Sequence, residues 1–390
     1  MGAAINRPGA GRLGGKMSAR SQVIGADPFG RSAPELVVAV SRAGALGVLD
    51  VDGPDWSRAI DEVRARTTDP FAIRAGGARL AEPNFSLPAQ VDTIVLAAGA
   101  AASRLPGPVA DGRTVLATVR SQAESLCAMR AGADGLIAKG AESGGLVGNT
   151  EAFVFLQQLL AAHPGVPIWV QGGIGLYTAA AAVAAGAHGV VLDSQLALAR
   201  ETRLDGAVRQ AIRSMDGSET RVVGDHRVYT RPDLPAARIS ADVSSSVVAG
   251  QLGTDIERQL LPIGQDAAAA SVLADRFVSA GGIVTAIRRQ IHDQIFSARA
   301  IRPLAAGHGV ADTFATRYPI AQGPMTRVSD CAAFAAAVAD AGGLPFLALA
   351  LLRRDEVRVL LEETSALLGE RPWGVGILGF VPPELREEQL

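Results

Sequence analysis

The sequence predicts an α/β fold built on one complete (β/α)8 barrel, and three observations lead to this prediction. Eight short apolar runs alternate with helical stretches between residues 23 and 192. The runs are continuous rather than alternating, as in parallel strands that are covered on both faces. Glycine-rich motifs follow the ends of the later runs, where barrels place their ligands. Strict strand-then-helix order favours a closed barrel over an open sheet.

The elements of this barrel follow from the same pattern. Strands are expected at 23–29, 46–51, 71–75, 93–98, 114–119, 135–139, 167–171 and 189–192. Helices are expected up to residue 43 and at 55–67, 121–131, 150–163 and 176–185. A capping box, Ser32-Ala33-Pro34-Glu35, is predicted to open the first helix. A doubly wound sheet is the alternative, but its G-x-G-x-x-G fingerprint is absent after the first strand.

The remaining chain divides into four predicted segments around this barrel, which is expected to occupy residues 21–200. Residues 1–20 are basic, hold no acid and offer no apolar stretch for a signal peptide, so a disordered tail is expected. After residue 198 the alternation stops, and residues 201–298 are interpreted as a small appended helical subdomain. Residues 299–318 are expected to be a linker, followed by a last domain at 319–390.

This last domain repeats the opening of the barrel. Pro28 to Ser32 corresponds to Pro324 to Ser329, and Ala43 to Leu46 corresponds to Ala341 to Leu344. A repeat at this distance indicates a domain duplication. The second copy is expected to form strand, helix, strand, helix, strand at 319–325, 329–340, 344–349, 355–368 and 373–380. Three strands cannot close a barrel, so residues 319–390 are predicted to be the start of a second, truncated barrel in a longer natural chain.

Composition narrows the classes of function. The net charge of −2 gives no electrostatic case for nucleic acid or an anionic membrane, and no apolar run is long enough to span a bilayer. Cys127 and Cys331 lack metal-ligand spacing and are interpreted as small core residues in a reducing compartment. We therefore expect a cytoplasmic protein.

Glycines at the ends of the later strands suggest a ligand site. Gln171-Gly172-Gly173-Ile174 ends the seventh strand, and Val191-Leu192-Asp193-Ser194 ends the eighth. Loops after these two strands commonly bind phosphate in barrels, because glycine lets backbone N–H groups approach an anion. The alternative is that Gly172 and Gly173 are merely turn residues.

The loop after the sixth strand is a second candidate for ligand binding. It runs from Lys139 to Gly148 and is rich in glycine. Lys139 and Lys16 are the only lysines in an arginine-rich chain, so Lys139 suggests a compact cation near a flavin or a phosphate. A surface lysine or a lysine held in a salt bridge remains the alternative.

Together these pieces resemble the nitronate monooxygenase family and its relatives, the flavin-dependent enoyl-thioester reductases, over about residues 21–295. That family has an A-P-M turn, an S-T-P-E-L helix start, a Q-G-x-E-A-G-G-H loop, an A-G-G-I turn and a G-T-R-F segment. The corresponding segments here are Asp27-Pro28-Phe29, Ser32 to Leu36, Lys139 to Leu146, Gln171 to Ile174 and Asp193 to Leu196. Gly264-Gln265-Asp266-Ala267 resembles the family's G-Q-S-A segment.

The resemblance implies a cofactor, substrates and partners. It implies FMN, with NAD(P)H as a candidate reductant, and a small-molecule or carrier-bound acyl substrate. The tandem arrangement is similar to flavin barrels inside polyketide- or fatty-acid-synthase-like proteins, whose other domains would be the partners. The substrate pocket is expected at Leu146 and Gln265. The implied FMN contacts are Asp27, Pro28, Phe29, Lys139, Gly145, Gly172, Gly173, Asp193 and Ser194.

Two departures from the family pattern fall at the expected site. The family's loop histidine, its base or proton donor, falls on Leu146, which cannot exchange a proton. The glycine after strand eight falls on Asp193, whose carboxylate would repel a phosphate if it pointed toward it. The chain's own histidines lie outside this loop and are interpreted as structural: His163, His188, His226, His292 and His308.

Three functions therefore remain open. The first is an FMN-dependent enoyl reductase that acts on acyl thioesters, with a solvent proton replacing that of the histidine. The second is nitronate oxidation, which suffers most from Leu146. The third is a catalytically degenerate barrel that serves as a scaffold in a large synthase, which both departures favour.

Overall fold

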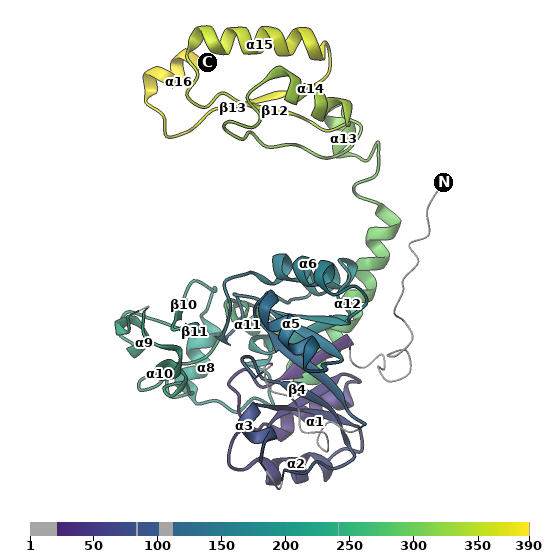
Figure 1. Cartoon of the computed structure of the whole chain (residues 1–390), viewed down its shortest axis with the longest axis vertical. Coiled ribbons are helices and arrows are strands. Elements are labelled where there is room, and N and C mark those ends of the chain that lie inside the picture. Colours follow the sequence, from purple (N-terminus) through teal and green to yellow (C-terminus); the bar gives the residue numbers. More distant parts are fainter. Residues whose placement is uncertain (1–21, 83–84, 101–111, 241, 390) are drawn as a thin grey trace. The chain divides into compact units, whose positions relative to one another are not determined.

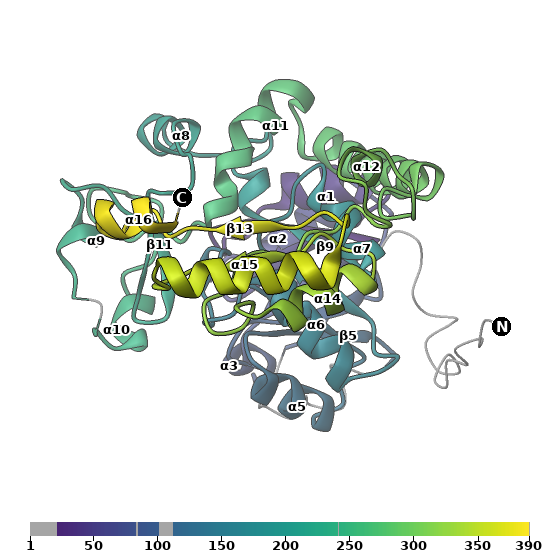
Figure 2. The same cartoon turned by 90° about the horizontal axis from the view of Figure 1, so that it is seen from above.

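The structure is a computed structural model that describes residues 22–82, 85–100, 112–240 and 242–389. It divides into two compact units, Met1–Ile295 and Phe296–Leu390, which are described separately here. The tail predicted at 1–20 lies outside the described residues, as do parts of the two loops that precede and follow β4. Figure 1 shows the elements of both units, and Figure 2 shows them from above.

Unit 1 contains a closed barrel of eight parallel strands, which confirms the predicted fold. Each strand pairs with the next in chain order, and β1 closes the ring by pairing with β9. The strands are β1 (Val23–Ala26), β2 (Leu46–Asp50), β3 (Phe71–Ala75), β4 (Val91–Leu96), β5 (Thr114–Val119), β6 (Gly135–Lys139), β8 (Ile168–Gln171) and β9 (Gly189–Leu192). β1 is shorter than predicted because the carboxylate of Asp27 accepts the backbone N–H of Phe29, which turns the chain.

Helices lie outside the strands (Figure 1). They are α1 (Pro34–Arg42), α2 (Trp56–Arg64), α3 (Gly77–Leu80), α5 (Gln122–Arg130), α6 (Ala152–Ala162) and α7 (Thr178–Ala184). The predicted capping box is wrong. The hydroxyl of Ser32 donates to the carbonyl of Asp50 on the neighbouring strand instead, and α1 begins at Pro34 without a side-chain cap.

The inside of the barrel is filled by an apolar layer. Its residues come from all eight strands: Ile24, Ala26, Leu46, Val48, Ala72, Val95, Leu116, Ile137, Trp169 and Val191. Side chains that alternate with these face the helices and form the larger core. The indole of Trp169 also contacts the ring of His188, with centroids 4.8 Å apart.

The appended region of unit 1 contains a small sheet that the sequence did not predict. The sheet joins β10 (Thr220–Val223) and β11 (His226–Tyr229) to β7 (Gly145–Leu146), which belongs to the loop after β6. The helices of this region are α8 (Gly206–Arg213), α9 (Pro235–Arg238), α10 (Ser245–Ala249), α11 (Ala270–Phe277) and α12 (Ala280–Ile301), with short 3-10 turns η2 (Ser194–Leu196) and η3 (Gln265–Ala269).

The two cysteines lie at the surface of the protein. Cys127 and Cys331 are both free and exposed, so their interpretation as core residues is wrong. Among the described residues no single helix is long and apolar enough to cross a membrane. A bent pair, Gln265–Phe277 with Ala280–Ile301, passes that test by length and composition together, and several of its apolar side chains are buried in the core of unit 1.

Unit 2 repeats the opening order of the barrel. A parallel bridge joins Ala321 to Leu344, and β12 (Phe346–Ala348) pairs in parallel with β13 (Gly374–Gly376). The helices are α13 (Val310–Thr313), α14 (Ala332–Asp340), α15 (Arg354–Leu368) and α16 (Pro383–Gln389). The strand, helix, strand, helix, strand order is the predicted one, although the first strand is reduced to a bridge and the other two are shorter than predicted. The helices α13 and α16 were not predicted. The predicted boundaries of the linker and of this domain remain predictions.

Gly47 tests the close contact between α1 and β2. A Cβ at Gly47 would lie 2.6 Å from the carbonyl oxygen of Val37, so Gly47→Ala should lower the free energy of unfolding by about 1–3 kcal/mol. Gly206→Ala is the matched control, because its Cβ would meet nothing within 4 Å and alanine favours the helix. Urea unfolding of both variants measures the difference. Equal stabilities would contradict the close contact.

Candidate functional site

A polar layer lies directly above the apolar layer, at the carboxyl ends of the strands. Side chains two residues further along each strand point to the same side of the sheet. Val48 and Ala72 are therefore followed by Asp50 and Arg74, which face each other in register. The inward Ile137 and Trp169 are followed in the same way by Lys139 and Gln171, and Val191 by Asp193. The residues singled out from the sequence thus meet at one rim of the barrel.

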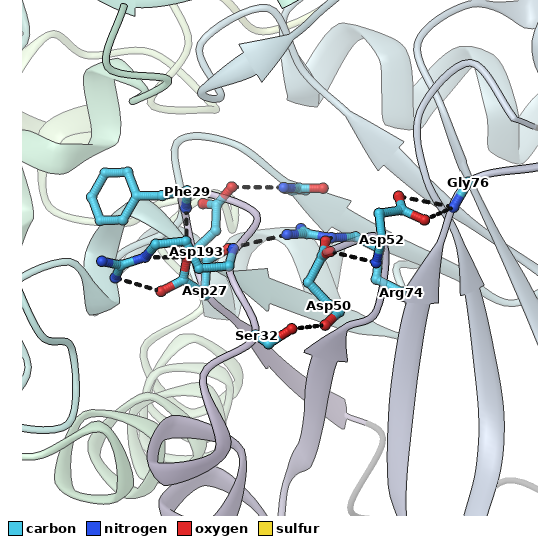
Figure 3. A network of polar contacts seen from close by, with 10 residues as sticks. Asp27, Phe29, Ser32, Asp50, Asp52, Arg74, Gly76 and Asp193 are labelled. Atoms are coloured by element: carbon cyan, nitrogen blue, oxygen red, sulfur yellow. Dashed lines mark hydrogen bonds and ion pairs between the residues drawn. The ribbon is translucent and has the colours of Figure 1, made fainter. Parts of the chain in front are cut away.

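Arg74 links the first three strands of this rim (Figure 3). Its Nε donates to the carboxylate of Asp50 over 2.9 Å, and its Nη2 donates to the carbonyl of Asp27 over 3.2 Å. Burial opposes the charge, but the carboxylates of Asp50 and, further off, Asp27 and Asp193 raise the pKa of Arg74. Arg74 is therefore a permanent cation that is already paired.

The turn after β1 is satisfied by its own side chain. The Asp27 carboxylate accepts the backbone N–H groups of Phe29 and Arg31 and an ion pair from the Arg31 guanidinium at 2.9 Å (Figure 3). Pro28 and Phe29 are only partly buried beside it. The backbone N–H of Phe29, one of the residues expected to contact FMN, is thus engaged within the protein.

Asp193 points into the structure, which settles the question that the sequence left open. Its side chain is only 4% exposed. Its Oδ1 accepts the backbone N–H of Ser194 at 2.7 Å, and its Oδ2 accepts Nε2 of Gln171 at 2.7 Å. The hydroxyl of Ser194 accepts the N–H of Gly264. The donor expected to hold a phosphate is therefore occupied by an internal carboxylate.

Asp266 brings a second carboxyl group to the same place. Its Oδ2 accepts Nε2 of Gln195 at 2.8 Å, while its buried Oδ1 has no hydrogen-bond partner among the described residues. Burial, and then the charges of Asp193 and Glu142, raise the pKa of Asp266 well above its usual range. Asp266 stands where the family has serine, and sequence reasoning singled out its neighbour Gln265, whose side chain is exposed.

Glu142 is the third carboxyl group in this corner. It accepts the first N–H of α6, from Ala152, at 3.1 Å and so ties the loop after β6 to that helix. Gly172 and Gly173 have φ of +109° and +64°, which favour glycine. A Cβ at Gly172 would lie 3.2 Å from Cδ of Glu142, and one at Gly173 would lie 3.1 Å from its Oε1. The absence of a side chain at both glycines therefore lets the carboxylate of Glu142 lie close to their backbone.

Lys139 is a cation without a partner. Its Nζ makes no hydrogen bond or ion pair with the part of the chain that the structure describes, and its side chain is partly exposed at the rim. Burial lowers the pKa of Lys139 to about 8, assisted by the positive charges of Arg74 and Arg120 and opposed by Asp193. Gly145, with φ of +70°, lies beside it, since an added Cβ there would be 3.9 Å from Nζ.

His226 faces the position of the missing histidine. β7 and β11 are antiparallel with Leu146 directly opposite His226, so the two side chains share one face of the sheet. The Nδ1 of His226 lies 2.7 Å from the carbonyl oxygen of Gly224, which places its proton there. Burial lowers the pKa of His226. No local sequence signal links residues so far apart, which explains why it was interpreted as structural only.

These residues can be tested against the FMN that the resemblance implies. A phosphate monoester carries a charge near −2 at neutral pH and needs free N–H donors. At the expected position the Ser194 N–H is taken by Asp193, and three carboxyl groups converge: Glu142, Asp193 and Asp266. The residues present do not fit the phosphate end of FMN.

Comparisons with known proteins bear on this site. Residues 89–231 match the family model described as nitronate monooxygenase. FabK from Thermotoga maritima is 23% identical, with a TM-score of 0.59 over 72% of this chain and 96% of that one. A point mutant of that FabK is 25% identical, with a TM-score of 0.58 over 72% and 95%.

A nitroalkane oxidase from Streptomyces ansochromogenes is also similar. It is 22% identical, with a TM-score of 0.55 over 71% of this chain and 97% of that one. No curated protein matches the chain.

The raised pKa of Asp266 predicts a pH-dependent stability. In the unfolded chain this carboxyl group ionises above about pH 4, whereas in the folded protein it ionises only at a higher pH. Between these two pKa values the free energy of unfolding falls by up to about 1.4 kcal/mol for each pH unit. Asp266→Asn should remove this loss, so its free energy of unfolding should rise relative to that of the wild type between pH 4.5 and pH 7.5. Urea unfolding across that range tests it. The exposed Asp61→Asn is the control, and parallel curves for D266N and the wild type would refute the prediction.

Proposed function

We propose that unit 1, whose residues 89–231 match the family model described as nitronate monooxygenase, keeps the form of an oxidoreductase barrel but serves without FMN as a scaffold module of a larger synthase-like protein. The observation that carries this proposal is the inward carboxylate of Asp193 on the Ser194 N–H. It replaces the family's glycine and supplies the negative charge that a bound phosphate would otherwise bring.

A second departure supports the same conclusion. Lys139 stands where the family loop begins with glutamine, and its charge interacts with that of Asp193. The chain has thus placed opposite charges at the ends of two strands, where a flavin would need neutral contacts and free donors. With Arg74 paired to Asp50 and Asp27 paired to Arg31, the rim is largely neutralised by its own side chains.

The synthase context rests on the tandem arrangement. Unit 2 repeats the opening order of unit 1, and duplicated barrels in one chain are typical of a multidomain protein. The partners that we propose are other synthase domains and a carrier-bound acyl chain. In this role the barrel binds other synthase domains, and any flavin chemistry takes place in those domains.

An FMN-dependent oxidoreductase is the second candidate function, acting on acyl thioesters with NAD(P)H as reductant, or on nitronates. The left-handed Gly172 and Gly173 and the unpaired Lys139 favour it, because they keep parts of a ligand site at the correct rim. Such a function requires the carboxylates of Asp193 and Glu142 to move or take up protons when FMN binds.

Flavin titration distinguishes these two candidates. We expect the purified chain to be colourless and to bind FMN weakly or not at all, because like charges meet at the phosphate position. Asp193→Gly should tighten FMN about 10- to 100-fold, or about 1.4–2.8 kcal/mol. Asp193→Asn is the matched control that keeps the side-chain size and should improve binding for the same reason. A yellow wild-type protein with stoichiometric FMN would reject the flavin-free proposal in favour of the second.

Leu146→His tests whether a proton-exchanging group is the other missing part. In the Asp193→Gly background it should raise nitronate turnover above that of the single variant, because it restores a titratable group at the family position. Oxygen consumption with a nitronate substrate measures this. If Asp193→Gly binds FMN and Leu146→His adds nothing, loss of the histidine does not explain loss of activity.

A further inference from the structure

We propose that Lys139 is a nucleophilic amine that forms an imine with an aldehyde or ketone at the mouth of the barrel. This activity goes beyond the proposed function, and it needs no flavin. It rests on where the sixth strand ends. Lys139 is the last residue of β6 and points inward above Ile137, in register with Gln171.

Lys139 has no counter-ion in contact among the described residues, in contrast to Arg74 and Arg120. Arg74 is paired with Asp50, and Arg120 with Glu124. Nζ of Lys139 makes no such contact with the described residues. An ammonium group removed from water without a partner is unfavourable, so the neutral amine is favoured.

The charges that face Lys139 come from four other elements. Burial, with smaller contributions from Arg74 on β3 and Arg120 after β5, lowers the pKa of Lys139 to about 8, while Asp193 after β9 and Asp266 in η3 oppose this shift. At pH 7.5 roughly a quarter of such an amine is unprotonated, against about 0.1% of an ordinary lysine. An amine of this kind is a nucleophile near neutral pH.

The amine is accessible, since the side chain of Lys139 is not fully buried. Lys139 is partly exposed, and its neighbour Gly145 has no side chain to cover Nζ. Asp266 is a second titratable group in this corner, and burial and the charge of Asp193 raise its pKa.

The reaction is a condensation and balances without an oxidant or reductant. The lone pair of Nζ attacks the carbonyl carbon, a C–N bond forms and the carbonyl oxygen takes up a proton, which gives a carbinolamine. Loss of that hydroxyl as water leaves the C=N bond of the imine. The ligand class is therefore a compound with a free aldehyde or ketone group.

Reductive trapping tests the proposal on the full chain. The protein is treated with propanal and sodium cyanoborohydride from pH 6 to pH 10, with Nα-acetyl-lysine as a reference amine, and then mapped by peptide mass spectrometry. Because Lys139 and Lys16 are the only lysines, each adduct is assigned without ambiguity. We expect Lys139 to gain a propyl group at least about tenfold faster than the reference at pH 7.5, with a midpoint near pH 8. Unfolding in urea should abolish this advantage.

Two variants sharpen the test. Lys139→Arg should remove that adduct and leave labelling of Lys16 unchanged. Asp193→Asn removes the negative charge that raises the pKa of Lys139 most, and it should move the midpoint for Lys139 to lower pH. An unlabelled Lys139 in the folded protein, or one that reacts no faster than the reference at any pH, overturns the proposal. Because FMN takes no part in the trapping, this failure is independent of the flavin titration.

Discussion

At the carboxyl end of β9, the carboxylate of Asp193 accepts two hydrogen bonds. One comes from the backbone N–H of Ser194 and the other from the side-chain amide of Gln171 on the neighbouring strand β8. The charge of Asp193 contributes to the pKa shifts of Arg74, Lys139 and Asp266 at the same rim. After burial, the charge of Asp193 is the largest contribution that raises the pKa of Asp266, and it also raises the pKa of Lys139 against the effect of burial. The carboxylate of Asp193 thus occupies the position where the family resemblance implies the phosphate of FMN.

The sequence was sufficient for the barrel because continuous apolar strands and their order are local signals. It was also sufficient to gather Lys139, Gln171 and Asp193 at one rim, since each directly ends a strand. It could not give the direction of the Asp193 side chain, which depends on a rotamer and on Gln171. The failed capping box has a similar cause, because the hydroxyl of Ser32 found a partner on another strand.

Long-range pairing explains most of what was missed. Leu146 and His226 are opposite each other only because a two-residue strand in one loop joins a hairpin from the appended region. Unit 2 shows the converse, since its helices and parallel pairs follow chain order, as they do in β1 to β3. Where neighbours in sequence pair with each other, periodicity alone predicts the arrangement. Where distant segments meet, only the folded chain reveals the contact.

The apolar layer beneath the rim closes the interior of the barrel, so no channel runs along its axis. Trp169, fully buried, lies within that layer, so nothing passes from one end of the barrel to the other. A guest that reaches Lys139 must leave through the opening by which it entered, together with any water that it releases.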